Sequence, residues 1–274
     1  MENRNLKVGV IGLGLIGGSI LKALNKINTP QTFELIGISK SSHRKAAQFC
    51  TLSSPNIKDV KNCDIVFVCS KMSETLGVLD ELENIVSRDC IVADVSSLKR
   101  FVNKKKYSFN FIGSHPMAGT EFSGFEASFA ELFYDAKWIL NKHNETLEDL
   151  IKKMGAKPII LDENTHDKHA CLISHLPMLI STALLNTVIK EDESALGIAS
   201  SGFRDTTRLS LTDADLALDM LELNEDNFEI YIDKFIENLK ELKNMSKMEF
   251  INTLKSIQKI RKTMYDDNGK NKLS

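Results

Sequence analysis

The fold of the N-terminal part of the chain is decided by residues 7–17, Lys7-Val8-Gly9-Val10-Ile11-Gly12-Leu13-Gly14-Leu15-Ile16-Gly17. The first five residues have the character of a buried strand, and an apolar helical segment follows the last glycine. Glycines at this spacing between a strand and a helix indicate a dinucleotide-binding fold, because they allow a tight turn, a close approach of the backbone to a pyrophosphate and close packing of helix on strand. Phosphates would bind the free N–H groups of the helix N-terminus. We expect cofactor contacts from Gly12, Gly14, Leu15, Ile16 and Gly17; the loop alone leaves a flavin open beside a nicotinamide.

Short apolar strands continue to alternate with helical segments up to about residue 160, which predicts a mostly parallel, doubly wound sheet. The further strand candidates are Glu34–Ser39, Asp64–Cys69, Cys90–Asp94, Asn110–Gly113, Ala136–Leu140 and Lys157–Leu161. Beyond Asp162 the spacing is helical, and the apolar positions from Phe228 to Leu242 predict a helix buried on one face. We therefore expect an α/β fold, with a Rossmann-type domain at residues 1–163 and an all-helical domain at residues 164–274.

Composition favours a small-molecule partner. The chain has 274 residues, of which 42% are hydrophobic and 26% charged, and its formal net charge is −2. This balance gives no electrostatic footprint for nucleic acid or an acidic membrane. The five cysteines lack CxxC or metal-ligand spacing, and no leader segment precedes the first strand, so we expect a cytoplasmic protein without a bound metal. The apolar stretch from Cys171 to Ile189 contains His175, Pro177 and Asn186, which predicts a buried helix rather than a membrane span.

The end of the second strand predicts which nicotinamide cofactor is used. An NAD enzyme usually has an acidic residue there to bind the ribose hydroxyls. Here the turn contains hydroxyls and cations instead, which can bind a 2′-phosphate: Ser39, Lys40, Ser41, Ser42 and Arg44. NADP is therefore the expected cofactor, with NAD less favoured, and an exposed turn indifferent to the phosphate is the alternative. Cys69 and Ser70, after the next strand, are also expected to contact it.

A candidate general base lies just beyond another strand end. Asn110–Gly113 is followed by Ser114-His115-Pro116-Met117-Ala118-Gly119-Thr120, and ligands of open α/β sheets bind beyond the carboxyl ends of the strands. A neutral imidazole at His115 can accept the proton of a substrate hydroxyl as hydride leaves the adjacent carbon. Pro116 restricts His115 to extended backbone conformations and so helps to fix its direction.

Four blocks together carry a family resemblance: the His115 block, Asp94-Val95-Ser96-Ser97, Ser174-His175-Leu176-Pro177 and Gly202-Phe203-Arg204-Asp205-Thr206-Thr207-Arg208. They resemble the prephenate and arogenate dehydrogenases of tyrosine biosynthesis. The resemblance implies hydride transfer from C4 of a cyclohexadienol to the nicotinamide, proton transfer to His115 and loss of the ring carboxylate as carbon dioxide. It also implies a homodimer that pairs through the helical domain.

The same resemblance assigns roles to individual residues. Ser97 would hydrogen-bond the substrate hydroxyl and the histidine, with a helix N-cap as its alternative role, and Arg208 would bind the ring carboxylate. Asp205 could orient or gate Arg208, although a surface pair between Arg204 and a neighbouring aspartate is an alternative. The remaining expected substrate contacts are Ser174, His175, Thr120, Ser201, Gly202 and Arg204.

Two positions depart from the family pattern. Met178 stands where prephenate-using members commonly have a histidine, and Ala217 lies near where many members carry a tryptophan. With the NADP-like turn, these departures favour the cyanobacterial and plant type of arogenate dehydrogenase. A β-hydroxyacid dehydrogenase or imine reductase, and a non-catalytic NADPH-binding regulator, are the alternatives.

Overall fold

The computed structural model describes residues 5–28, 32–120 and 122–265. By its internal contacts the chain divides into two compact units, Met1–Asn227 and Phe228–Ser274, and each is described by itself. The first unit contains the sheets together with the first helices of the C-terminal part. The domain boundary expected after residue 163 stays a prediction.

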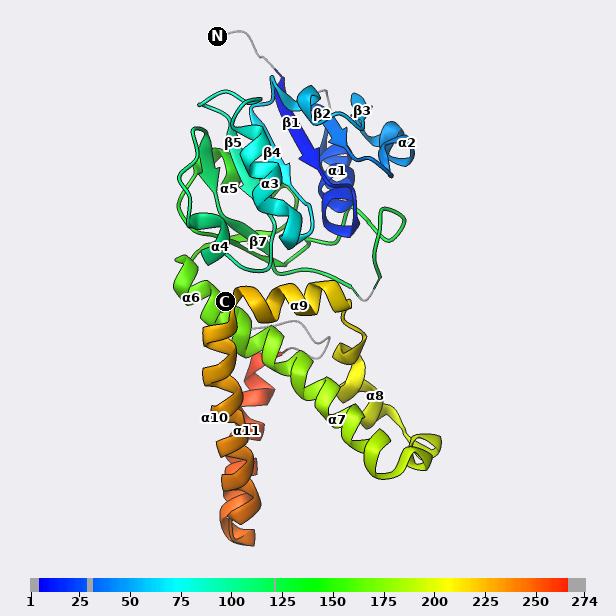
Figure 1. Cartoon of the computed structure of the whole chain (residues 1–274), viewed down its shortest axis with the longest axis vertical. Helices are drawn as coiled ribbons and strands as arrows, with labels where there is room; N and C mark the ends of the chain where they lie inside the picture. The colour runs from blue at the N-terminus through cyan, green and yellow to red at the C-terminus, as the bar shows by residue number, and fades with distance from the viewer. Residues whose placement is uncertain (1–4, 29–31, 121, 266–274) are drawn as a thin grey trace. The chain divides into compact units, whose positions relative to one another are not determined.

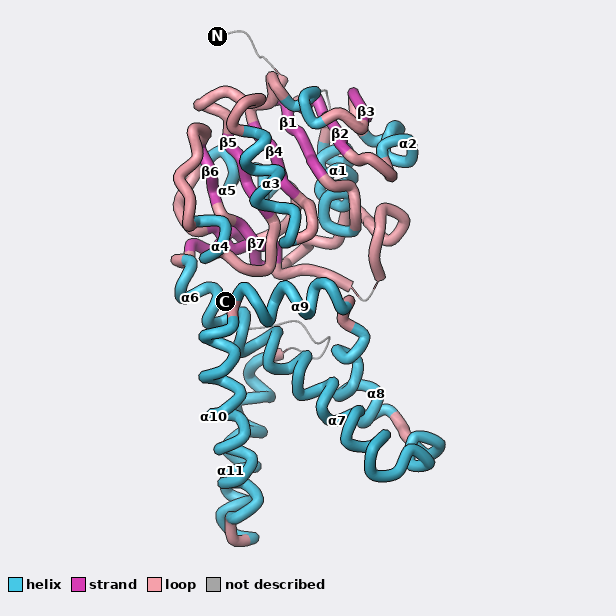
Figure 2. The backbone as a smooth tube through the Cα atoms, viewed as in Figure 1, coloured by secondary structure: helices cyan, strands magenta, loops and turns pink. Residues whose placement is uncertain are grey.

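The central sheet of the first unit has six parallel strands in the order β3-β2-β1-β4-β5-β6; Figure 1 labels the first five of this order and Figure 2 also labels β6. Its strands are β1 (Leu6–Ile11), β2 (Phe33–Ile38), β3 (Leu52–Ser54), β4 (Ile65–Val68), β5 (Ile91–Asp94) and β6 (Asn110–Ile112). This is the strand order of the Rossmann fold, whose ligand crevice lies where the order reverses, between β1 and β4. The predicted fold class is confirmed.

Helices cover both faces of this sheet, because successive strand residues point to opposite sides. Val8 and Phe67 pack with Leu24 of α1 (Leu15–Ile27) and with α5 (Glu145–Lys153) in one core. Val66 packs with Leu79 of α3 (Met72–Leu82) and with α4 (Arg100–Asn103) in the other. The connections from β2 to β3 and from β3 to β4 contain three short helical segments: α2 (His43–Ala46), η1 (Ala47–Phe49) and η2 (Ile57–Val60).

A second, three-stranded sheet differs from the expectation of one continuous sheet (Figure 2). It consists of β7 (Ser114–Pro116), β8 (Lys137–Leu140) and β9 (Lys157–Ile160). β7 pairs antiparallel with β8, and β8 pairs parallel with β9. The last two predicted strands therefore exist but belong to this sheet. The buried Trp138 indole in β8 donates to Ser114 Oγ (3.2 Å), and the Ser114 hydroxyl donates to the backbone oxygen of Asp94, so the two sheets are joined at β5.

Helices follow from residue 163 onward, as predicted. In the first unit they are α6 (Glu163–Ala170), the π-helical turn η3 (Cys171–His175), α7 (Leu176–Asp192), η4 (Glu193–Ile198), α8 (Ser201–Thr207), η5 (Arg208–Leu211) and α9 (Ala214–Leu223). α10 (Glu225–Asn244) begins at the end of this unit and continues into the second, where α11 (Lys247–Met264) follows. A capping box between Ser246 and Glu249 starts α11.

The expected burial of the C-terminal helices is wrong for a single chain. Of α7 only Met178 and Ser181 are buried, and α10 and α11 contain no buried residue in the part that the structure describes. The run Glu163–Ile198 is also long and apolar enough to cross a membrane, judged by length and composition alone. The helices are amphipathic as predicted, but the described residues of one chain do not cover their apolar faces.

Candidate active site

His115 lies in the short strand β7, three residues beyond the last residue of β6, so it follows the strand end as the sequence analysis expected. It pairs with Ile139 of β8, and its side chain is half-buried. Its backbone direction is therefore fixed by the second sheet as well as by the following Pro116. A strand is a more rigid support for a reacting group than a loop.

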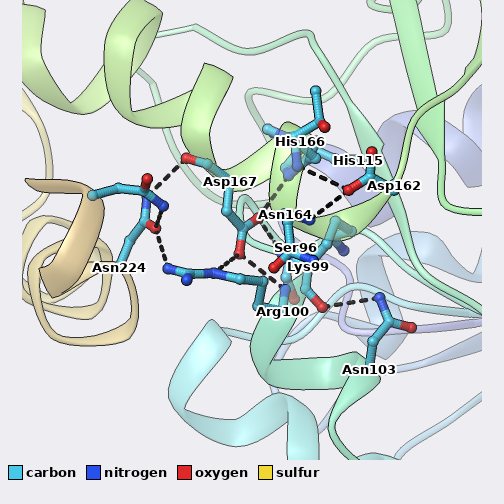
Figure 3. Close-up of polar contacts among 12 residues, drawn as sticks. Ser96, Lys99, Arg100, Asn103, His115, Asp162, Asn164, His166, Asp167 and Asn224 are labelled. Atoms are coloured by element: carbon cyan, nitrogen blue, oxygen red, sulfur yellow. Dashed lines mark hydrogen bonds and ion pairs between the residues drawn. The ribbon is translucent and has the colours of Figure 1, made fainter.

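The His115 imidazole belongs to a triad, which we define as His115, His166 and Asp167 (Figure 3). His115 Nδ1 lies 3.0 Å from His166 Nε2, and His166 Nδ1 lies 2.7 Å from Asp167 Oδ1. His166 is 3% exposed and Asp167 is fully buried. The sequence analysis missed both. The sequence does contain a signal for them, because a histidine and an aspartate stand next to each other in the first turns of α6. Asp162 caps this helix by accepting from the N–H groups of Asn164 and Thr165.

The hydrogen bonds of the triad determine which nitrogen of His115 is free. The Asp167 carboxylate only accepts, so His166 Nδ1 must carry the proton between them. In a neutral imidazole the other nitrogen is then an acceptor, so His115 donates from Nδ1 to His166 Nε2. This leaves the lone pair of His115 Nε2 available. The triad therefore holds His115 in the tautomer that a general base requires.

Burial and nearby groups keep His115 neutral. Burial lowers the pKa of His115 well below its ordinary value, and the positive charge of Lys99 and the imidazoles of His166 and His175 lower it further. For Asp167, burial alone would raise the pKa. Hydrogen bonds from His166 and from the backbone N–H groups of Arg100 and Lys99 outweigh burial, and the pKa of Asp167 is lowered. Asp167 is thus a carboxylate and His115 a neutral base near pH 7.

A fully buried ion pair lies beside the triad. Lys99 Nζ binds Asp94 Oδ2 and donates to the backbone oxygen of Ser114 (2.6 Å), the residue before His115. Asp94 also accepts from the backbone N–H groups of Ser96 (3.0 Å) and Ser114 (2.9 Å). Burial lowers the pKa of Lys99, and the Asp94 carboxylate opposes this effect. The pair fixes the start of β7, and sequence analysis missed it because lysines are rarely fully buried.

Ser97 lies in the turn between β5 and α4, between the two residues of this ion pair, and it is half-buried. It is not the N-cap of α4: that position is Lys99, and Asp167 Oδ1 and Oδ2 accept from the N–H groups of Lys99 (2.7 Å) and Arg100 (2.9 Å). In the described part of the chain the Ser97 hydroxyl has no hydrogen-bond partner. Its assigned role toward the substrate hydroxyl stays a prediction.

His175 is fully buried, and neither of its ring nitrogens has a hydrogen-bond partner among the described residues. Burial lowers its pKa to about 4, although Asp167 opposes this effect. Nine residues of regular α-helix would place His175 on the face opposite His166. The π-helical turn η3 changes this spacing, and His175 interacts electrostatically with Asp167 and His166, so it lies near the triad. Such turns are frequent at functional sites. Ser174 is half-buried in the same turn.

The other predicted substrate contacts lie apart from the triad. Thr120 is exposed and accepts a hydrogen bond only from the N–H of Phe122 (3.2 Å) among described residues. The segment from Ser201 to Arg208, including Gly202, is exposed, apart from Thr207 and the half-buried Phe203. Asp205 accepts from Arg204 Nε (3.0 Å) rather than from Arg208. The structure thus shows the surface pair at Arg204, and the substrate roles of this segment stay predictions.

The glycine loop fits a pyrophosphate. Gly12 has φ of +88°, and a Cβ there would lie 2.5 Å from the backbone oxygen of Cys69. A Cβ on Gly17 would lie 2.0 Å from Gly12 O, so helix and loop require glycine at both positions. At Gly14, the N-cap of α1, a Cβ would meet no protein atom within 4 Å. The first turn has no acidic side chain and no capping side chain, so its N–H groups can bind phosphate.

The turn after β2 presents its polar groups as expected. Ser39 Oγ accepts from the N–H of Ser42 (3.0 Å), which shapes the turn. Lys40, Ser41 and Arg44 are exposed, and neither cation has an ion-pair partner in the described ranges. Cys69 is half-buried, and Ser70 Oγ lies 3.1 Å from Thr75 Oγ1 at the end of β4. No group of three or more His, Cys, Asp or Glu among the described residues is placed to bind a metal ion.

Comparison with known families agrees with this geometry. Residues 22–160 match the nucleotide-binding domain of prephenate dehydrogenase, and residues 162–261 match its dimerization domain. The chain belongs to the prephenate dehydrogenase family. The family resemblance is thereby confirmed, and the protein is an oxidoreductase of this family with a nicotinamide cofactor.

Several members of the family are similar over most of the chain. Prephenate dehydrogenase of Lactococcus lactis is 31% identical, over 86% of this chain and 70% of that protein. Cyclohexadienyl dehydrogenase of Zymomonas mobilis is 28% identical, over 86% and 87%. Synechocystis arogenate dehydrogenase has a TM-score of 0.79 at 28% identity, covering 93% of this chain and 99% of that chain. Prephenate dehydrogenase of A. aeolicus, solved with hydroxyphenyl propionate and NAD+, has a TM-score of 0.84 at 25% identity, covering 95% and 99%.

Proposed function

We propose that the protein catalyses the oxidative decarboxylation of arogenate, or of prephenate, in tyrosine biosynthesis, with His115 as the general base. One observation carries the proposal: the triad leaves His115 Nε2 as a free acceptor on a rigid strand beyond the end of the central sheet. Family membership supplies the reaction class. Family membership disfavours the hydroxyacid dehydrogenase and imine reductase alternatives, and 3-hydroxyisobutyrate dehydrogenase shares only the fold, at 10% identity. Turnover of arogenate or prephenate would exclude the regulator alternative.

The residues of the chain perform the proton transfer and the orientation of the substrate. His115 Nε2 accepts the proton of the ring hydroxyl while Asp167 and His166 stabilise the imidazolium that forms. A bound nicotinamide cofactor, whose pyrophosphate the N–H groups of the α1 N-terminus would hold, would supply the hydride acceptor for the carbon that bears the ring hydroxyl. Arg208 binds the ring carboxylate until it departs as carbon dioxide and its bonding electrons complete the aromatic ring. His115 then returns the proton to the phenol oxygen, so the histidine is regenerated.

Arogenate is the proposed substrate and NADP the proposed cofactor. Met178 is buried and has no hydrogen-bond donor for the keto acid side chain of prephenate. Exposed Lys40 and Arg44 flank a turn without any carboxylate, which favours a 2′-phosphate over free ribose hydroxyls.

Steady-state kinetics with two substrates and two cofactors test this proposal. We expect kcat/KM to be at least about tenfold higher with NADP than with NAD, and higher with arogenate than with prephenate. Ser39→Asp should reverse the cofactor order, because a carboxylate repels the 2′-phosphate and accepts hydrogen bonds from ribose hydroxyls. Equal values for both cofactors in the unmodified enzyme would refute the NADP proposal.

A cytoplasmic homodimer is the proposed assembly. Apolar side chains of α10 and α11 are exposed, among them Leu239, Phe250 and Ile257, and they fall within the residues that match the dimerization domain. A second copy covers such faces in a closed, symmetric arrangement. Light scattering should give twice the 30.7 kDa of one chain at micromolar concentration without detergent. A monomer, or a protein that requires detergent because a membrane covers the Glu163–Ile198 run, would contradict the proposal.

A further inference from the structure

Arg100 joins three helices next to the triad. Its guanidinium binds the Asp226 carboxylate at the start of α10 with two nitrogens, and Nη2 donates to Asn224 Oδ1 (2.7 Å). On the other side, Nε lies 3.4 Å from Asp167 Oδ2, and the backbone N–H of Arg100 donates to the same oxygen (2.9 Å). Arg100 therefore contacts the triad carboxylate twice, while its guanidinium is held by Asn224 (Figure 3) and by Asp226.

These contacts restrict the orientation of Asp167. Its other oxygen, Oδ1, accepts from His166 Nδ1 and from the backbone N–H of Lys99, both at 2.7 Å. Its backbone oxygen accepts from Asn224 Nδ2 (2.9 Å). Both carboxylate oxygens of a fully buried residue are thus occupied, so Asp167 cannot rotate without breaking a hydrogen bond. The position of His166 depends on a carboxylate that Arg100 holds.

Arg100 also contributes to the charge around the histidines. Its side chain is 25% exposed, so its charge is only partly screened by water. Four other charged or titratable groups surround His115 and His166, from the end of β5, the N-cap of α4, α6 and η3: Asp94, Lys99, Asp167 and His175. A further carboxylate, Asp226 at the start of α10, faces Arg100 itself. Asp94 and Lys99 neutralise one another, whereas Arg100 faces two carboxylates, those of Asp167 and Asp226, of which Asp167 belongs to the triad.

We propose that Arg100 is a positioning residue for proton transfer: it fixes Asp167 against His166 and offsets the carboxylate charge, and so sets the pH at which His115 loses its activity as a base. The inference rests on the proposed role of His115. It extends that role to a residue that touches neither substrate nor cofactor.

Substitution of Arg100 should change the pH profile as well as the rate. In Arg100→Gln, kcat should fall about tenfold while KM stays within about threefold, because the substrate contacts are unchanged. Loss of a cation favours the imidazolium, so the midpoint of the acid limb of kcat/KM should rise by about half a pH unit or more. Arg100→Lys keeps the positive charge, so the midpoint of the acid limb of kcat/KM in this variant should stay close to that of the unmodified enzyme.

Two further variants separate this role from simple stabilisation. Asp226→Asn removes the carboxylate that neutralises Arg100 from the side away from the triad, so the midpoint of the acid limb should fall rather than rise. Because Asp226 is exposed, this variant should fold even if Arg100→Gln does not. Lys105→Gln removes another cation that pairs with Asp80 (2.6 Å) and Glu83 (3.4 Å), away from the triad, and should leave the midpoint in place. Three results would overturn the inference. The first is a lower melting temperature of Arg100→Gln with an unchanged midpoint of the acid limb. The others are a higher midpoint in Asp226→Asn and a midpoint in Lys105→Gln that rises as much as in Arg100→Gln.

Titration of the histidine rings by NMR with 13Cε1-labelled histidine separates this inference from the proposed function. If the pH midpoint of the histidine ring titration shifts in Arg100→Gln together with the acid limb of kcat/KM, both the role of Arg100 and the role of His115 are supported. If the ring titration moves and the acid limb does not, the effect of Arg100 on the triad stands and the assignment of His115 as the base fails.

Discussion

The two halves of the proposed active site differ in how completely a single chain builds them. The triad is enclosed: His166 and Asp167 are buried, and every nitrogen and oxygen between His115 Nδ1 and Asp167 has a partner. The segment that carries Arg208 is exposed, and its neighbours Ile198 (89% exposed) and Leu211 (73%) are uncovered. One chain therefore encloses the proposed proton-transfer half, whereas the proposed carboxylate site is exposed in a single chain.

The difference has a physical reason. A buried base with a fixed tautomer needs all its polar partners in place before substrate arrives, because reorganisation during the reaction raises the barrier. A guanidinium that binds a charged carboxylate tolerates exposure, since water solvates it until the substrate replaces that water. Substitutions in the two halves should therefore affect different kinetic constants.

The largest effect is expected at the enclosed half. His115→Asn should reduce kcat by about 10²–10⁴-fold, the range for a lost general base, and should fold and bind cofactor nearly normally because the amide can still donate to His166. Stopped-flow turnover and cofactor titration measure the two properties. Near-normal kcat in this variant would remove His115 from the mechanism and, with it, the contrast between the halves.

A smaller effect is expected at the exposed half. Arg208→Ala should raise KM by about 10- to 100-fold, the value of a lost charge-assisted hydrogen bond, with cofactor affinity almost unchanged. Arg204→Ala, which removes the neighbouring exposed cation, is the matched control and should raise KM much less. An unaltered KM with weakened cofactor binding would move Arg208 from the substrate to the cofactor.

The smallest effect concerns the pH dependence of stability at the enclosed half. His175 has a pKa of about 4 in the folded state, below its ordinary value, so its neutral form favours folding above pH 6.5 and this contribution is lost as pH falls toward 4. At pH 5 the loss from His175 alone is about 2 kcal/mol. Urea unfolding of the protein and of His175→Leu at pH 7 and pH 5 should show a smaller loss in the variant. Equal losses would mean that His175 is not buried as a neutral ring.

The sequence predicts the main sheet well because its strands are short, apolar and separated by clear helical segments. It does not predict β3, whose three residues Leu52-Ser53-Ser54 lack an apolar pattern at the sheet edge. It also does not reveal that Lys137–Leu140 and Lys157–Ile160 leave the main sheet, because an apolar strand carries no information on its partner.

The candidate site shows the same limit. His115 and His175 lie in blocks whose residues point to chemistry, so a sequence can propose them. The bond from His115 to His166 links positions 51 residues apart, and the Lys99 amine is buried although its local sequence resembles a solvated turn. Such partners are set by tertiary packing, which no local pattern encodes.

The orientation of the His115 side chain depends on the number of residues around it as much as on their identity. β7 has only three residues, and it is held at both ends, by Gly113 N–H donating to Asn141 Oδ1 (3.0 Å) and Met117 N–H donating to Lys137 O (2.8 Å). Side chains alternate between the two faces of a strand, so one inserted or deleted residue between these anchors would turn His115 away from His166. In deep mutational libraries, exchanges within residues 113–117 other than at His115 should therefore be tolerated better than any change in the number of these residues.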